Sequence, residues 1–327
     1  MIRCMPPMFQ MRSSRALLIA CIACCFAASG GCKEKDNSKT IAVIPKGSTH
    51  EHWHRVKAGA EKAGKEFGYE IAWKAPQTEG NREQQIGLVE QSAADKMAAI
   101  VVAPLDDQGL VRPIREAATA KIPVVLIDSG LKGDAGKDYI AYVGTNNTKG
   151  GEMAGEALGR ALGGKGKVVM LRYAIGSAST AEREEGFLTA IKKYPGLQVI
   201  SDNQYAGDTS DKAQTVAANM VDELRKADGI YCPNESSTYG MLLALRKADL
   251  IGKVKFVGFD TSPPLLQAVR DGELTAVVAQ NPLRMGYLGV KAAVDSIKGN
   301  KVEPSIDTGE ILITKENVDS EDVKALF

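Results

Sequence analysis

The stretch Val124-Val125-Leu126-Ile127-Asp128 is the first of four short apolar runs that each end on a side chain able to form hydrogen bonds. A continuous apolar run is typical of a strand in a parallel sheet that is covered on both faces. Ligands of open α/β sheets bind beyond the carboxyl ends of such strands. We therefore expect the four terminal side chains to face one crevice, and their chemistry suits a ligand rich in hydroxyl groups. The other three runs are Gly229-Ile230-Tyr231-Cys232-Pro233-Asn234, Phe256-Val257-Gly258-Phe259-Asp260 and Ala276-Val277-Val278-Ala279-Gln280.

Outward from these runs, short apolar strands alternate with amphipathic helices from Thr40 onward. After the strand at 40–45, apolar residues recur at helical spacing up to Phe67, and the alternation then continues to the strand that ends at Asp128. A second series of the same plan begins at 140–145. This β-α-β alternation predicts parallel sheets flanked by helices. The fold class that we expect is α/β, with two similar Rossmann-like lobes.

The first 32 residues differ in character from the rest. The chain begins with a basic segment that contains Arg3, Arg12 and Arg15, and an apolar run at 16–28 follows. Such a run after a basic head is typical of an export signal, and it is shorter than the roughly 20 residues of a membrane span. The small residues that end in Cys32 resemble the lipobox of bacterial lipoproteins, where the cysteine is lipidated.

We therefore predict a lipoprotein signal peptide at 1–32, lipidation of Cys32 and a flexible tether at 33–39. An ordinary cleaved signal and an uncleaved anchor remain as alternatives. In each case the folded part is exported, and we expect a periplasmic location with a membrane anchor through Cys32.

Composition limits the function classes. The formal net charge is +1, which argues against a nucleic-acid partner, since those partners select a basic face. Five of the six cysteines lie in the first 32 residues, which leaves only Cys232 in the folded part. A single cysteine cannot form an internal disulfide, so the core alone must hold the exported domain together. Cys232 lies in an apolar strand and reads as an inert buried thiol.

We expect no catalytic residues, metal or cofactor. No glycine-rich phosphate loop follows the first strand, and no serine stands in a nucleophile elbow. The strongest contrary signal is the cluster of His50, His52 and His54, which could bind a metal if the segment were extended. The cluster precedes a helix, however, and residues two apart on a helix do not face each other. We expect His52 and Trp53 to line the crevice instead, with the indole stacked on a ring.

Arg183 is a further candidate for the crevice. It lies near the start of a helix that follows a strand end, in Thr180-Ala181-Glu182-Arg183-Glu184-Glu185-Gly186-Phe187. Its planar guanidinium can donate to two hydroxyls or to a ring oxygen. The alternative is a surface arginine paired with the neighbouring glutamates.

Several of these motifs resemble a known family. The segments are 182–187, 257–260 and 276–280, together with Lys57-Ala58-Gly59-Ala60 near the start. They are similar to periplasmic sugar-binding proteins of the ribose-binding type, which serve ABC transporters and are related to the effector domain of lac-repressor-like regulators. The resemblance covers roughly residues 40–314.

The resemblance implies two lobes joined by three crossings, here near Thr145, Gln280 and Asp307. It divides the chain into an N-terminal lobe, 40–145 plus 281–307, and a C-terminal lobe, 146–280 plus 308–327.

The resemblance also implies a ligand-binding set. One member is Lys46, because Ile44-Pro45-Lys46 is similar to relatives that bind rhamnose or a furanosyl signalling molecule. His52 stands where a phenylalanine is usual, Ala103 and Ser129 differ from the ribose pattern, and 207–209 lacks the second-lobe aromatic. The other implied ligand-binding residues are His52, Trp53, Asp128, Arg183, Asn234, Phe259, Asp260 and Gln280.

The function that we expect is extracytoplasmic capture of a monosaccharide and its delivery to an ABC transporter permease, by a monomer. A sensing module that presents a sugar or furanosyl signal to a membrane receptor is the alternative from another class. A hydrolase or metal-dependent enzyme built on the histidine cluster is the third. No DNA-binding helix-turn-helix precedes the first lobe, which argues against a repressor.

Overall fold

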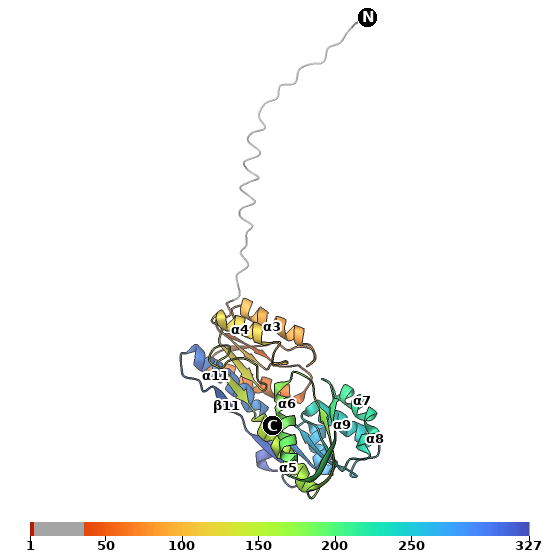
Figure 1. Ribbon diagram of the computed structural model, residues 1–327. Coiled ribbons are helices and arrows are strands. Elements are labelled where there is room, and N and C mark those ends of the chain that lie inside the picture. Colours follow the sequence, from red (N-terminus) through yellow and green to blue (C-terminus); the bar gives the residue numbers. More distant parts are fainter. Residues whose placement is uncertain (3–35, 327) are drawn as a thin grey trace. The chain divides into compact units, whose positions relative to one another are not determined.

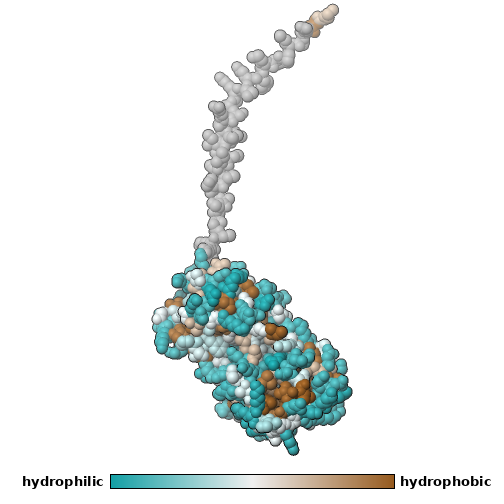
Figure 2. Space-filling view, viewed as in Figure 1, coloured by the Kyte–Doolittle hydropathy of each residue, from teal (hydrophilic) through white to brown (hydrophobic). Residues whose placement is uncertain are grey.

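The computed structural model describes residues 1–2 and 36–326 (Figure 1). Residues 3–32 of the predicted signal peptide, which include Cys32, and residues 33–35 of the predicted tether lie outside the described residues. Within the part that is described, no helix combines the length and the apolar character needed to cross a membrane. The surface of the folded part that Figure 2 shows is mainly hydrophilic, with apolar residues gathered in a few patches.

The first sheet is entirely parallel, with strand order β11-β5-β4-β3-β1-β2. One face packs against α2 (Glu51–Phe67) and α11 (Pro282–Ile297), and the other against α3 (Arg82–Ala94) and α4 (Val111–Thr119). Burial on both faces explains why its central strands read as unbroken apolar runs. The strands are β1 (Thr40–Ile44), β2 (Glu70–Trp73), β3 (Ala99–Val102), β4 (Val124–Ile127), β5 (Ala141–Gly144) and β11 (Ser305–Asp307).

The second sheet repeats this plan with the order β12-β10-β9-β8-β6-β7. One face packs against two long helices, α5 (Asn147–Ala161) and α6 (Ala178–Ile191). Its strands are β6 (Lys165–Arg172), β7 (Gly196–Tyr205), β8 (Gly229–Tyr231), β9 (Lys255–Phe259), β10 (Ala276–Gln280) and β12 (Glu310–Thr314). The remaining helices are α7 (Ser210–Asn219), α8 (Val221–Leu224), α9 (Glu235–Lys247), α10 (Pro263–Asp271) and α12 (Glu321–Lys324).

The two-lobed α/β fold class is therefore as expected. Among the described residues, the chain passes from one sheet to the other three times: after β5, after β10 and between β11 and β12. One strand departs from the parallel arrangement, because β12 runs antiparallel to β10. The short connection after β11 accounts for this, since a parallel pairing would need a long crossover.

Three elements differ from the sequence expectations. The sequence predicts one helix at 211–224, but the structure divides this segment at Met220 into α7 and α8. The helix α10 is an additional element that the sequence expectations do not include, and its two leading prolines, Pro263 and Pro264, are favourable in the first turn of a helix. The sequence predicts a strand at 197–201, but the structure extends it to Tyr205 as the edge strand β7. The added residues are mostly polar, so the apolar pattern did not indicate them.

Each lobe contains a pair of long helices that touch through glycines. A Cβ atom at Gly286 of α11 would lie 1.9 Å from the carbonyl oxygen of Val56 in α2. In the second lobe, a Cβ atom at Gly186 of α6 would lie 2.1 Å from the carbonyl oxygen of Thr148 in α5. No side chain fits between such backbones, so these glycines set how closely the helices approach.

Replacing Gly286 by alanine should therefore destabilise the protein by about 1–3 kcal/mol, the usual cost of overpacking. The melting temperature should fall by several degrees, measured by circular dichroism. Gly87→Ala in α3 is the matched control, because a Cβ atom there meets nothing within 4 Å. Equal melting temperatures for the two variants would contradict the close packing of α2 and α11.

Candidate functional site

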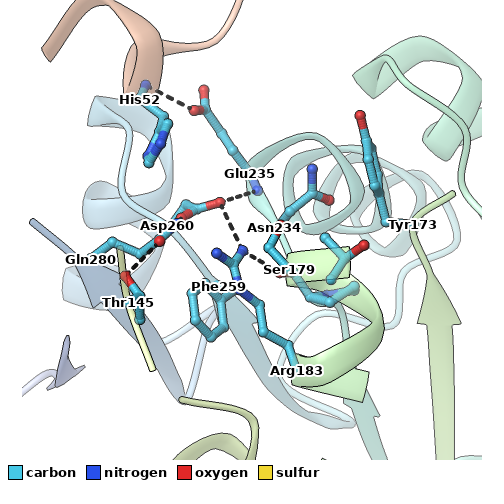
Figure 3. Close-up of polar contacts among 12 residues, drawn as sticks. His52, Thr145, Tyr173, Ser179, Arg183, Asn234, Glu235, Phe259, Asp260 and Gln280 are labelled. Carbon is cyan, nitrogen blue, oxygen red and sulfur yellow. Dashed lines mark hydrogen bonds and ion pairs between the residues drawn. The ribbon is translucent and has the colours of Figure 1, made fainter. Parts of the chain in front are cut away.

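The carboxyl ends of the two sheets face each other across a small pocket. Both lobes contribute side chains, most of them polar, and Figure 3 shows how several converge. The lining residues are Lys46, His50, His52, Trp53, Glu79, Asp128, Tyr173, Ser179, Thr180, Arg183, Asn234, Asp260 and Gln280.

Two strand-end aspartates occupy equivalent places in the two lobes. Asp128 follows β4 and Asp260 follows β9, and both have left-handed backbones, with φ of 62° and 69°. Asparagine, aspartate and glycine tolerate this conformation best. The two aspartates therefore share a backbone conformation, and the carboxylates of both line the pocket.

Asp128 is paired with two first-lobe side chains. Its carboxylate lies 3.0 Å from Nζ of Lys46 and 3.2 Å from Nε2 of His52. Burial alone would raise the pKa of Asp128, but these two neighbours outweigh burial and hold it well below its usual range. The group is therefore a charged acceptor at any physiological pH.

Lys46 also reaches the second lobe. Its ammonium donates to Oγ of Ser179 at 3.0 Å and to Oγ of Ser177 at 3.4 Å, both at the start of α6. One buried cation thus joins the end of β1 to the opposite lobe.

Arg183 is buried, with 2% of its surface exposed, so it is not the surface arginine of the alternative interpretation. Its Nε donates to Oδ1 of Asn147 at 2.9 Å, and its Nη1 donates to the carbonyl oxygen of Pro233 at 3.0 Å. Its Nη2 has no partner among the described residues and is free to donate to a ligand. The ring of Phe259 lies 4.0 Å from the guanidinium and supports it from below (Figure 3). Phe259 itself does not line the pocket.

Asp260 and Gln280 link the second lobe to the crossings. Nε2 of Gln280 donates to Asp260 at 2.6 Å, and Oε1 of Gln280 accepts from the hydroxyl of Thr145 at 2.7 Å (Figure 3). The other oxygen of Asp260 accepts from the backbone N–H of Glu235 at 2.9 Å. Asn234 caps α9 by accepting from the backbone N–H of Ser237, so it is both a helix cap and a pocket residue.

The three histidines do not converge. His50 and His52 are buried at the start of α2 and contact different carboxylates, whereas His54 is exposed. No group of three or more metal-ligating side chains occurs within the described ranges. Trp53 is 3% exposed, donates its indole N–H to Glu79 at 2.6 Å and meets the ring of His52 edge to face.

Glu79 and Tyr173 are pocket residues that the sequence did not indicate. Tyr173 directly follows β6, so the strand-end rule applied to that run would have found it. It supplies a second-lobe aromatic, which we expected to be missing because of the residues at 207–209. Glu79 lies in the loop between β2 and α3, and no sequence signal distinguishes it from other loop glutamates.

The pair of His50 and Glu79 is ionised. Burial lowers the pKa of His50, but Glu79, at 2.7 Å, outweighs burial and raises it to about 9. Burial likewise raises the pKa of Glu79, but His50, Lys46 and a hydrogen bond from Tyr173 together lower it to about 2. The pocket therefore contains fixed charges of both signs, each with an opposite charge beside it.

Comparison with known proteins places the chain. A model of the periplasmic binding protein domain matches residues 41–301, and the chain belongs to that family. It is similar to the D-allose-binding periplasmic protein of Escherichia coli K12, with 32% identity over 80% of this chain and 86% of that protein. The ribose import binding protein of Salmonella typhimurium is 28% identical over 92% of this chain and 98% of its own length.

Two solved structures share the fold closely. A carbohydrate transporter solute-binding protein of Agrobacterium radiobacter, in complex with D-arabinose, is 35% identical with a TM-score of 0.83, covering 88% of this chain and 98% of that one. An ABC transporter solute-binding protein of Agrobacterium vitis with bound D-fucose is also 35% identical, with a TM-score of 0.84 and coverage of 87% and 98%.

A histidine NMR titration should give a pKa near 9 for His50. In Glu79→Gln the pKa of His50 should fall well below 9, because the nearest anion is lost while burial remains. The raised pKa means that His50 stabilises the fold fully below about pH 6.5, and that this contribution is lost as the pH rises through about 9. Glu83→Gln is the matched control, because Glu83 is exposed on α3 and its loss should leave the pKa of His50 unchanged. A His50 titration that Glu79→Gln leaves unchanged would contradict the pairing.

Proposed function

We propose that this protein captures a monosaccharide between its two lobes and delivers it to an ABC transporter permease. The observation that carries the proposal is a pocket between the two lobes that is lined from both of them by fixed donors and acceptors. Family membership and relatives with bound sugars support the same function.

The chemistry of the lining suits a neutral polyol. Carboxylates of Asp128 and Asp260 accept from hydroxyls, and the free Nη2 of Arg183 donates to one. Hydrogen bonds to charged groups contribute about 1.5–3 kcal/mol each, so a few of them support micromolar or tighter binding after the costs of association. Trp53 and Tyr173 add aromatic surface for the C–H faces of the ring.

Binding would close the lobes around the sugar. The lobes in this proposal are 40–145 plus 281–307 and 146–280 plus 308–327, as the sheet memberships support. Because bonds from both lobes to one ligand exist only in the closed form, the ligand shifts the population toward closure. The permease would recognise the closed form, and the proposal requires no catalytic residue.

We further propose that the protein acts in the periplasm, anchored through a lipid on Cys32. Replacing Cys32 by serine should move the protein from the membrane fraction to the soluble extract and abolish incorporation of labelled palmitate. Cys232→Ser is the control, because that thiol is buried and should leave the fractionation unchanged. Membrane association that survives Cys32→Ser would favour an uncleaved anchor.

Calorimetry against pentoses, hexoses and deoxysugars, with D-arabinose, D-fucose, D-allose and D-ribose among them, tests sugar capture. At least one should bind with micromolar or tighter affinity. Asp260→Asn should weaken that binding about 10- to 100-fold, because a charged acceptor is lost. Asp249→Asn is the matched control, since Asp249 also has a positive φ but lies on the surface. Failure of every sugar to bind would overturn the proposal.

A further inference from the structure

Glu79 is one of the side chains that connect the two walls of the pocket. It lies in the loop after β2, with only 8% of its surface exposed. The loop packs on Gly47, where a Cβ atom would lie 2.9 Å from Cγ of Glu79. Glycine at that position therefore lets the glutamate reach the pocket.

The Glu79 carboxylate is close to three potential donors. Oε1 accepts from Nε1 of Trp53 at 2.6 Å and lies 2.7 Å from Nδ1 of His50, and Oε2 accepts from the hydroxyl of Tyr173 at 2.6 Å. Trp53 and His50 belong to the first lobe, whereas Tyr173 follows β6 of the second. A single anion thus fixes the plane of the indole and also bonds to the opposite lobe. Such charge-assisted bonds are among the stronger ones in proteins.

The same two residues separate two cavities. The inner pocket and an outer cavity share Glu79 and Tyr173, and no other lining residue. The outer cavity lies at the edge between the lobes, and its lining includes Arg82, Asp106 and Asp208. Glu79 and Tyr173 therefore lie at the border that the two cavities share.

We propose that the hydrogen bond between Glu79 and Tyr173 is the gate of the inner pocket, and that Glu79 is a positioning residue that couples the gate to Trp53. This proposal rests on the proposed function in one respect, namely that the molecule retained by the gate is a sugar. Its two consequences are a slow escape of bound sugar and an indole held in place when the gate is closed.

The first test uses the protein without sugar. The protein has two tryptophans, so its NMR spectrum contains two indole N–H signals, from Trp53 and Trp73. Tyr173→Phe removes only the gate donor, and it should speed exchange of the Trp53 indole proton with deuterium about tenfold or more. The Trp73 signal is the internal reference. Tyr205→Phe is the matched control, because Tyr205 is 42% exposed on an edge strand.

The second test uses D-arabinose, D-fucose and D-allose as probes. For each sugar that binds, Tyr173→Phe and Glu79→Gln should each raise Kd about 10- to 100-fold, mainly through faster dissociation measured by stopped flow. In the double variant, Tyr173→Phe should add little, because its partner is already lost. A purely structural role would instead lower the melting temperature and leave the dissociation rate unchanged.

The outcomes separate the two proposals. If the wild-type protein binds no sugar, sugar capture fails while the indole exchange still decides the gate. If Tyr173→Phe changes neither the Trp53 exchange nor, where a sugar binds, its dissociation rate, the gate is overturned. Because Tyr173→Phe removes a single hydroxyl, this result can be read even if Glu79→Gln fails to fold.

Discussion

Charge pairing inside a buried pocket is the constraint on which this site depends. Three buried cations each lie beside a buried carboxylate: Lys46 beside Asp128, His50 beside Glu79, and Arg183 within 3.9 Å of Asp260. An isolated charge in such a place would cost several kcal/mol, whereas a paired and hydrogen-bonded one is tolerated. The pairs hold the polar groups in position before any ligand arrives, so a neutral ligand leaves no charge uncompensated.

The same hydrogen bonds connect the pocket to the crossings between the sheets. Gln280 ends β10, beside one crossing, and bonds both to Asp260 in the pocket and to Thr145 beside another crossing. Arg183 bonds to Asn147, whose amide donates to the hydroxyl of Tyr142 on the last strand before that crossing. The side chains of the pocket and the segments that cross between the sheets are therefore direct neighbours. In the proposed mechanism, a bound ligand would act on the angle between the lobes through these contacts.

Sequence patterns located the parts of the site that follow from regular structure. Strand-end reasoning found Asp128, Asn234, Asp260 and Gln280, because the carboxyl ends of parallel strands meet at one edge of each sheet. The sequence patterns did not indicate Glu79, because its position depends on how a loop packs across the cleft. The resemblance implies that Phe259 contacts the ligand, and what the structure shows is its ring packed against the guanidinium of Arg183. These contacts form between lobes or between layers, and periodicity along one strand carries no information about them.

The left-handed backbone at Asp128 and Asp260 also bears on how ligand preference can change in evolution. At these two positions most side chains would add conformational strain, so the accessible replacements are few, chiefly asparagine and glycine. Lys46, His52 and Ser179 line the same pocket and do not have positive φ angles. Substitutions that change ligand specificity in related proteins should therefore concentrate at positions such as these three, while the two aspartates should be replaced rarely.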